Sequence, residues 1–326
     1  MTNDTPTIPR DSIVLGVSCH YHDAAACLVR DGEIVAAAQE ERFTRQKHAA
    51  EFPVRAVNAI LQEEGLSVLD VGCVAFYEKP YEKLVRTVIS HLGAWPLSWR
   101  NFRRSMPEWL GKRLTLPLDV QADLAYDGPV VFVKHHLAHA ASAFLASPFP
   151  EAAILTADGL GEWATTSFGV GRGTDIEILR ELHYPDSLGL VYSAVTTHLG
   201  FRALSGEGRV MALSDFGEPR FIDDFREIIP VKEDGSFRVD DRYFRFVRGR
   251  RMYGRRFERR FGPARRHGDE ITDRHRDIAA SLQLHLEEIL LRMARHVHSV
   301  TGMTRLCTAG GVFLNCVTNS QILEET

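Results

Sequence analysis

The sequence predicts an α/β fold with two lobes, and two observations support this prediction. Short apolar segments gather near the N-terminus and again after residue 150, and each group is typical of three strands joined by turns. Each group also has an aspartate in the turn region between its first two strands, Asp23 in the first and Asp158 in the second. Two similar units in a chain of 326 residues indicate a duplicated fold with a ligand cleft between its lobes.

The first lobe, residues 1–146, is predicted to contain four strands before its helical insertion and a fifth at 130–133. The first four are the apolar runs 13–17, 24–29, 34–39 and 71–76. Arg30-Asp31-Gly32-Glu33 joins two of them, and Asp-Gly is a strong hairpin signal. Pro53–Glu64 has its apolar residues on one helical face, so the strand after it is expected to be parallel. The segment 77–127 is aromatic and irregular and is expected to be a helical insertion.

The second lobe, residues 147–326, repeats the pattern. Its strands are expected at 153–156, 163–170, 175–182 and 306–309, and its helices at 188–200 and 273–298. The last strand leads into Gly310-Gly311 and a helix that starts at Val312 and carries Asn315. A strand, a Gly-Gly turn and a helix can bring backbone N–H groups close to phosphate oxygens. The chain stops at Thr326 inside this helix, which predicts an incomplete second lobe and a fragment or one half of a split protein.

A duplicated two-lobed α/β chain is typical of the actin-like ATPase and sugar-kinase architecture, in which a ribonuclease H-like unit occurs twice. A kinase of that group is expected to have Asp-x-Gly-Thr after its first strand. This chain has Ser18-Cys19-His20-Tyr21-His22-Asp23 there, which disfavours phosphoryl transfer.

A group of histidines follows the predicted buried strand at 130–133. His135 and His139 are four residues apart in an Ala-rich helical segment, so they lie on one face, and Asp158 follows a neighbouring strand. Two imidazoles and a carboxylate suit a divalent transition metal with open coordination positions. The alternative is that these histidines cap the helix or lie in solvent.

The composition excludes several classes of protein. The net charge of −4 implies no general attraction to nucleic acid or to a membrane. The N-terminus has no apolar signal-peptide core, and no run approaches the roughly eighteen apolar residues of a membrane span. The five cysteines are scattered, which is typical of reduced thiols in a cytoplasmic protein.

The segment 242–266 is strongly basic, with eleven arginines in 25 residues and aromatic residues between them. One interpretation is an anion-binding arm for a nucleotide, a phosphate or RNA. The other is a solvated surface segment whose charge is balanced by acidic residues elsewhere. The sequence leaves both open.

Seven motifs in family order make the chain resemble the N-terminal part of the NodU/CmcH-type O-carbamoyltransferases of nodulation-factor and antibiotic biosynthesis. They are YHDAAACLVRDGEIVAAAQEERFTRQKH (21–48), HHLAHAASAF (135–144), LTADGLGEWATT (155–166), SLGLVYSAVTTHLGF (187–201), GEGRVMAL (206–213), RHRDIAASLQ (274–283) and GGVFLNC (310–316). Together they extend over nearly the whole chain.

The resemblance implies an ATP-dependent O-carbamoyltransferase domain, actin-like and related to the tRNA threonylcarbamoyl-transfer enzymes. In the family this domain holds a divalent metal, commonly Fe²⁺, with the H-x-x-x-H pair and carboxylates. It takes the carbamoyl group from carbamoyl-adenylate and passes it to a hydroxyl of a sugar or natural product. The adenylate is made from carbamoyl phosphate and ATP in a C-terminal domain of another fold.

The resemblance also assigns roles to the metal-site and nucleotide-site residues. It places His135 and His139 on the metal-binding pair and Asp158 on the metal-site carboxylate. The residues that fall on the nucleotide-binding loop are Gly310, Gly311 and Asn315. Arg209 stands where the family often has Lys, which keeps the charge of this nucleotide contact but changes its geometry.

Two catalytic roles follow from the resemblance as well. His22 lies in the family's His-Asp motif and is expected to deprotonate the acceptor hydroxyl. Lys47 lies at the basic end of the Glu-Arg-Phe-Thr-Arg stretch and is suited to hold a phosphate or carbamoyl oxygen. The family's later Asp-Ala-Gly-Gly segment and its adenylate-forming domain lie beyond residue 326. The expected partners are therefore a small hydroxyl acceptor and the missing half, in cis or in trans, and the chain alone is expected to be inactive.

Two alternatives remain at this point. Two histidines and one carboxylate also form the facial triad of non-haem iron(II) oxygenases, although no double-stranded β-helix pattern surrounds them. The other alternative is a fragment that binds a nucleotide or a partner protein without turnover.

Overall fold

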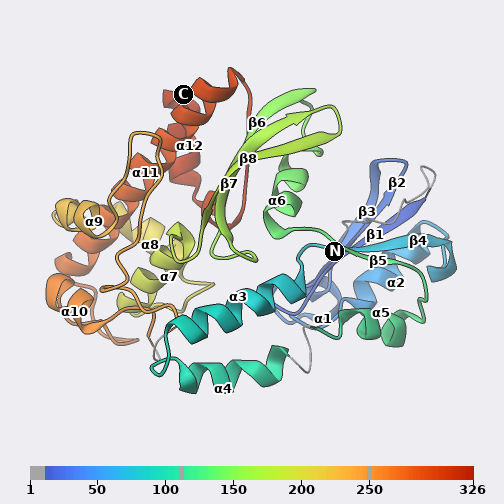
Figure 1. Cartoon of the computed structure of the whole chain (residues 1–326), viewed down its shortest axis with the longest axis horizontal. Coiled ribbons are helices and arrows are strands. Elements are labelled where there is room, and N and C mark those ends of the chain that lie inside the picture. Colours follow the sequence, from blue (N-terminus) through green and yellow to red (C-terminus); the bar gives the residue numbers. More distant parts are fainter. Residues whose placement is uncertain (1–11, 110–113, 248–250) are drawn as a thin grey trace. The chain divides into compact units, whose positions relative to one another are not determined.

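The computed structural model describes residues 12–109, 114–247 and 251–326 and shows a mixed α/β chain with two β-sheets (Figure 1). The chain divides into two compact units. The first consists of the described residues up to Thr87 and of Phe102–His135, and the second consists of Val88–Asn101 and His136–Thr326. The predicted two-lobed α/β fold class is confirmed. The sequence placed the boundary at residue 146, whereas the units divide after His135, at the start of helix α6 (His135–Phe144).

The sheet of the first unit has five strands in the order β3-β2-β1-β4-β5. Their bounds are Ile13–Ser18 (β1), Ala25–Arg30 (β2), Glu33–Gln39 (β3), Val71–Phe76 (β4) and Val130–Phe132 (β5). The predicted hairpin between β2 and β3 is present, with Asp31 and Gly32 both at positive φ, as a two-residue turn of this kind needs. The strand after the helical crossover, β4, is parallel as predicted and pairs with β1.

Helices cover this sheet and form its core. Helix α2 (Val54–Glu63) buries Ala56, Val57 and Ile60, whose helical spacing turns one apolar face toward the strands. The segment predicted as a helical insertion contains α3 (Pro80–Gly93), α4 (Trp99–Glu108) and α5 (Leu116–Leu124), and the short α1 (Glu41–Thr44) follows β3. Of these, α5 contributes Val120 and Leu124 to the same core.

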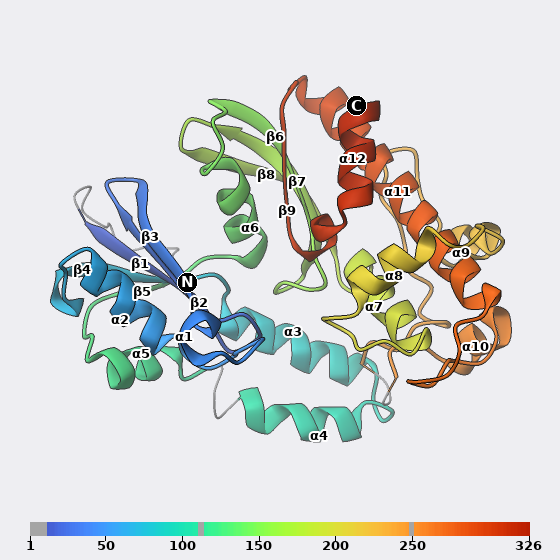
Figure 2. The same cartoon turned by 180° about the vertical axis from the view of Figure 1, so that it is seen from behind.

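The sheet of the second unit has four strands in the order β8-β7-β6-β9. Their bounds are Glu151–Ala157 (β6), Ala164–Arg172 (β7), Asp175–His183 (β8) and Leu306–Ala309 (β9). Neighbouring β6 residues point to opposite faces: Ile154 packs with Phe144 of α6, whereas Leu155 packs in the large core with α11 (Asp273–Thr301). Figure 2 shows α6 and α11 on opposite faces of this sheet.

The two sheets share their strand pattern, which is the duplication that the sequence predicted. In each, three antiparallel strands are followed by a parallel partner of the first strand, β4 beside β1 and β9 beside β6. The remaining helices of the second unit are α7 (Leu188–His198), α8 (Glu207–Ser214), α9 (Ile222–Ile228), α10 (Arg255–Phe261) and α12 (Cys316–Glu325). No helix in the described ranges is long and apolar enough to cross a membrane.

One predicted element was wrong in detail. The helix expected from Val312 is a 3₁₀ turn over Gly311–Leu314 followed by α12, which begins at Cys316. Asn315 is therefore the N-cap of α12 and does not lie inside a helix. The reason is local: its side chain accepts a hydrogen bond from the backbone N–H of Thr318, which stabilises a helix start at this position.

Candidate metal centre and nucleotide loop

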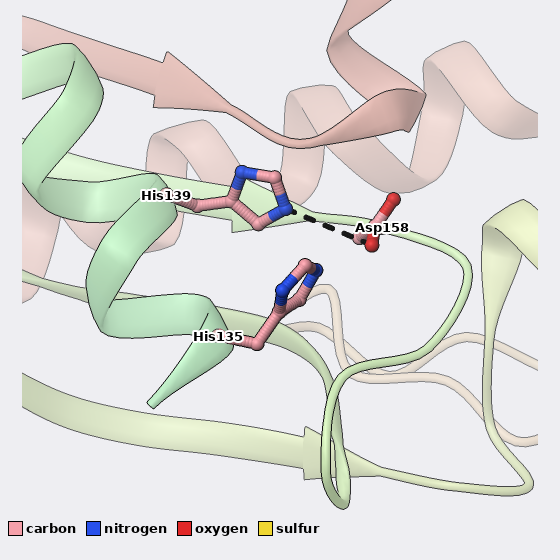
Figure 3. A group of neighbouring side chains, drawn as sticks. All are labelled: His135, His139 and Asp158. Atoms are coloured by element: carbon pink, nitrogen blue, oxygen red, sulfur yellow. Dashed lines mark ion pairs between the residues drawn. The ribbon is translucent and has the colours of Figure 1, made fainter. Parts of the chain in front are cut away.

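Helix α6 and the turn after β6 bring together two histidines and one aspartate. Ligand atoms of His135, His139 and Asp158 all lie within 4.8 Å of one another; His135 is 8% exposed, and the other two residues are partly buried. His139 Nε2 is 3.6 Å from Asp158 Oδ2, and the three side chains point toward a common region (Figure 3). The spacing of four residues places the two imidazoles on one face of α6, as predicted.

The third histidine of the motif has a different environment. His136 is 2% exposed, and its Nδ1 lies 2.7 Å from the hydroxyl of Thr156 on β6. That hydroxyl is in turn 2.6 Å from the hydroxyl of Ser167 on β7. His136 therefore links α6 to the sheet, whereas His135 and His139 face Asp158.

The turn that carries Asp158 is fixed by backbone hydrogen bonds. The N–H of Asp158 donates to the carbonyl of Thr165 at 2.9 Å, and the hydroxyl of Ser187 donates to the carbonyl of Gly159 at 2.6 Å. Ser187 is also the N-cap of α7, where it accepts from the N–H of Leu190. The backbone of the turn is thus held by the end of the sheet on one side and by a helix start on the other.

Asp158 also contacts the predicted nucleotide loop. The backbone N–H of Gly311 donates to Asp158 Oδ1 at 3.1 Å. Gly310 has φ of +98°, and a Cβ there would lie 2.3 Å from the carbonyl oxygen of Ala157. Only glycine fits this position, because the backbone of the loop passes so close to the end of β6.

Asn315 follows this loop in the sequence and belongs to a buried polar network. Its Nδ2 donates to Gln283 Oε1 at 2.7 Å, and its Oδ1 accepts from Gln283 Nε2 at 3.0 Å and from Thr318 N. Gln283 also accepts from the hydroxyl of Tyr192 and donates to Glu287, whose pKa is raised by burial. Asn315 is 8% exposed and its amide is already paired, which holds the loop and α12 to α11. Its contact with a nucleotide stays a prediction.

Arg209 lies exposed on α8, near this region of the second unit. Met211, two residues further along α8, has its sulfur 4.0 Å from Sγ of Cys316 at the start of α12. The start of α8 is fixed by Glu207, which accepts hydrogen bonds from Ser193 and from the backbone of Leu204 and Gly206.

The predicted base lies in the first unit, in the turn between β1 and β2. His22 Nδ1 is 2.8 Å from Asp23 Oδ2, and His48 Nδ1 is 3.1 Å from Asp23 Oδ1. One carboxylate therefore orients two imidazoles. Lys47 precedes His48 and is exposed. Asp23 adopts positive φ, a conformation that Asp tolerates better than most residues.

His48 was not predicted as a site residue. Its only signal in the sequence was its position beside Lys47, at the end of the motif 21–48. The contact with Asp23 spans 25 residues and is created by the fold: the N–H of Ala24 donates to the carbonyl of Ala49, which brings the segment after α1 beside the β1–β2 turn.

The comparison with protein families decides which family this is. The model described as "Carbamoyltransferase N-terminus" matches residues 13–326. The chain belongs to the carbamoyltransferase family. This confirms the resemblance that the seven motifs indicated.

Two curated relatives cover almost all of this member of the carbamoyltransferase family. It is 44% identical to protein sll1178 of Synechocystis over 96% of this chain and 52% of that protein. It is 34% identical to nodulation protein NolNO of Sinorhizobium fredii over 93% of this chain and 42% of that protein. The chain therefore spans about half of the length of these relatives, or less.

Among solved structures, HypF of T. kodakarensis is similar to this carbamoyltransferase-family chain, with a TM-score of 0.47 and 12% sequence identity. The match covers 97% of this chain and 44% of HypF. The predicted fold class rests on the duplicated strand order of the two sheets, which is observed directly.

Proposed function

We propose that this chain is the transfer part of an ATP-dependent O-carbamoyltransferase, which moves the carbamoyl group of carbamoyl-adenylate to a hydroxyl of a sugar or natural product. The adenylate would be formed from carbamoyl phosphate and ATP by another domain, in cis or in trans. The observation that carries the proposal is the double use of Asp158. One of its oxygens faces the histidine pair and the other accepts from the Gly-Gly loop.

The donor set fits a divalent transition metal, with Fe²⁺ as the proposed ion. Ligand atoms about 2.1 Å from a shared ion lie at most about 4.2 Å apart. The atoms of His135, His139 and Asp158 lie within 4.8 Å of one another, so small side-chain movements would allow all three to bind one ion. When bound, such an ion supplies Lewis-acid stabilisation of negative charge on phosphate oxygens.

The Gly-Gly loop would bind the nucleotide part of the donor. Gly311 presents its backbone at the end of β9, and Gly310 has no side chain that could obstruct a phosphate. Arg209 would add a positive charge to this site from α8. The Asn315–Gln283 pair would keep the loop in place from below.

His22 would act as the general base on the acceptor. If its Nδ1–H donates to Asp23, Nε2 carries the lone pair that accepts the proton of the acceptor hydroxyl. The acceptor oxygen forms a bond to the carbamoyl carbon, the bond from that carbon to the phosphate oxygen breaks, and AMP leaves with the electron pair. Asp23 stabilises the imidazolium that results, and Lys47 would hold a carbamoyl or phosphate oxygen.

The metal part of the proposal is tested by anaerobic titration with Fe²⁺. We expect about one ion per chain in the wild type, and at least about a 100-fold weaker affinity in the double variant His135→Ala/His139→Ala. The matched control is His183→Ala/His267→Ala, which removes two exposed imidazoles elsewhere and should bind like the wild type. Equal metal content in all three proteins would contradict the proposed site.

The transfer step is tested with the chain combined with its adenylate-forming half, carbamoyl phosphate, ATP and a panel of sugar acceptors. His22→Asn should slow carbamoyl transfer by about 10²–10⁴-fold and leave adenylate formation unchanged. His183→Asn, an exposed histidine in the second unit, is the control. Transfer by His22→Asn at the wild-type rate would exclude the role of this histidine as the base. Nucleotide binding without transfer in the wild type would favour a binding fragment.

A further inference from the structure

The arginine-rich segment is the largest concentration of charge in the chain. Residues 242–266 contain eleven arginines and one glutamate, a net charge of +10. The whole chain has a net charge of −4, so the other residues together carry −14. Charge of one sign on so short a segment is a feature of anion-binding surfaces, unless acidic neighbours neutralise it.

Many of these arginines do have acidic or carbonyl partners. Arg242 pairs with Asp240, Arg251 pairs with Glu258 at 2.6 Å, and Arg265 donates to the carbonyl of Leu199. These side chains hold the segment against its own surroundings and leave little charge for a ligand. Part of the arginine content of the segment therefore has a structural role in the fold.

Helix α10 (Arg255–Phe261) has a rigid inner face. Phe257 and Phe261 are buried, and their ring centroids are 4.3 Å apart. Phe261 also lies 4.8 Å from Phe225 of α9, and Phe257 lies 5.6 Å from Tyr253. Because this aromatic cluster fixes the inner face, the backbone that carries the side chains of the outer face is held in place.

The outer face of α10 borders a hollow. The hollow has a volume of about 460 Å³ and is lined by Tyr243, Arg256, Arg259 and Arg260. The three arginines are spaced three and four residues apart, so they share one side of the helix. The hollow is wide open to solvent, so a ligand there would lie on the protein surface.

The three arginines of the hollow differ in their partners. Arg260 pairs with Asp224 and Glu227 and donates to the hydroxyl of Tyr243 at 3.2 Å, so its guanidinium is fixed in place. Arg256 and Arg259 are exposed and form no ion pair with any residue in the described parts of the chain. The hollow therefore combines one anchored guanidinium with two that form no close ion pair in the described parts of the chain, although the charge of Arg256 helps to lower the pKa of Asp240.

We propose that this hollow, which we call the α10 hollow, binds the diphosphate group of a small ligand. Two guanidinium groups can each form paired hydrogen bonds to phosphate oxygens, and Arg does this better than Lys. The phenol of Tyr243, held by Arg260, lines the hollow and can donate to a further oxygen. Four lining residues suit a compact diphosphate, since an RNA backbone needs a longer stripe of contacts. The site is separate from the Gly310–Gly311 loop and does not depend on the proposed function.

The experiment measures binding of inorganic pyrophosphate to the full chain by calorimetry, with hydrogen–deuterium exchange to locate it. The test variant is Arg256→Gln/Arg259→Gln, which removes two charges and keeps polar side chains. The matched control is Arg172→Gln/Arg292→Gln, two exposed arginines that do not line the hollow. Thermal unfolding of each variant verifies that it is folded. Titrations with ADP show whether the diphosphate can belong to a nucleotide.

We expect saturable binding of pyrophosphate, weakened at least about 10-fold in the test variant and less than about twofold in the control. Exchange should slow in the peptide that contains α10. Three results would each overturn the proposal: no saturable binding at millimolar pyrophosphate, equal weakening in both double variants, or protection confined to residues 306–316. Binding of single-stranded RNA without binding of pyrophosphate would overturn it as well.

Discussion

Asp158 accepts the backbone N–H of Gly311 at 3.1 Å through one carboxylate oxygen, while its other oxygen lies 3.6 Å from Nε2 of His139. The sequence placed these residues in two separate predicted sites, a metal centre and a nucleotide loop. The structure joins them through a single side chain. A ligand bound at the histidine pair can therefore affect the Gly310–Gly311 loop, and the reverse, because a movement of the Asp158 carboxylate changes both contacts.

The double role of Asp158 predicts different effects for two substitutions. Asp158→Asn keeps an oxygen that can accept from Gly311 N–H but is a weaker metal ligand, whereas Asp158→Ala loses both functions. We expect both variants to bind Fe²⁺ at least about 10-fold more weakly than the wild type. Hydrogen exchange at Gly311 should accelerate only in Asp158→Ala. The same exchange rate in both variants would contradict a specific hydrogen bond to the carboxylate.

Gly310 should tolerate no side chain. Gly310→Ala would place a methyl group 2.3 Å from the carbonyl oxygen of Ala157 and would require positive φ. We expect its free energy of unfolding in urea to fall by about 3 kcal/mol or more. Gly173→Ala is the matched control, since that residue also has positive φ but no atom within 4 Å of the added methyl group. Gly173→Ala should lower the free energy of unfolding by about 1 kcal/mol. Equal losses in the two variants would show that the close contact at Gly310 is not important.

Much of the fold followed from local patterns. The Asp31-Gly32 turn, the alternating burial in β1 and the apolar stripe of α11 are properties of short segments, so they can be predicted from neighbouring residues. Family membership confirmed the resemblance built on seven motifs. The boundary between the units was less predictable, because it depends on contacts between segments far apart in the chain.

The site was predictable only in part. The spacing of His135 and His139 follows from helical geometry, so their shared face could be predicted. The contacts of His48 with Asp23 and of Gln283 with Asn315 join residues 25 and 32 positions apart, and no local pattern reports such pairs. The N-cap role of Asn315 was missed because the Gly-Gly turn suggested a helix that starts earlier.

His198 should make stability depend on pH. Its side chain is buried against Tyr253 and Phe257, and burial, together with the nearby charges of Arg274, His275 and Arg251, lowers its pKa to about 3. The unfolded chain has the ordinary histidine value of about 6.5 and takes up the proton first as the pH falls. The stabilising contribution is therefore complete above about pH 6.5 and decreases below it, by about 2 kcal/mol at pH 5.

The test compares urea unfolding at pH 7 and pH 5 for the wild type and His198→Phe. Neither ring nitrogen of His198 has a hydrogen-bond partner among the described residues, so phenylalanine removes the titration without breaking a hydrogen bond. The loss of stability between the two pH values should be about 2 kcal/mol smaller in the variant. His275 and His285, whose pKa values are also lowered by burial, contribute to the loss in both proteins. His267→Gln, an exposed control, should behave like the wild type.

The neighbouring histidines of α6 should separate stability from metal binding. His136 is buried and bonded to Thr156, so His136→Ala leaves a cavity between α6 and the sheet and removes one hydrogen bond of the Thr156 hydroxyl, which keeps its contact with Ser167. We expect its free energy of unfolding to fall by about 2–4 kcal/mol, with Fe²⁺ affinity of the folded chain within about twofold of the wild type.

His139 is 26% exposed at its side chain and faces Asp158. His139→Ala should therefore cost less than about 1 kcal/mol of stability but weaken Fe²⁺ binding by about 100-fold. Urea unfolding and anaerobic titration of both variants measure the two quantities. If His136→Ala lost the metal and His139→Ala kept it, the assignment of ligands along α6 would have to be reversed.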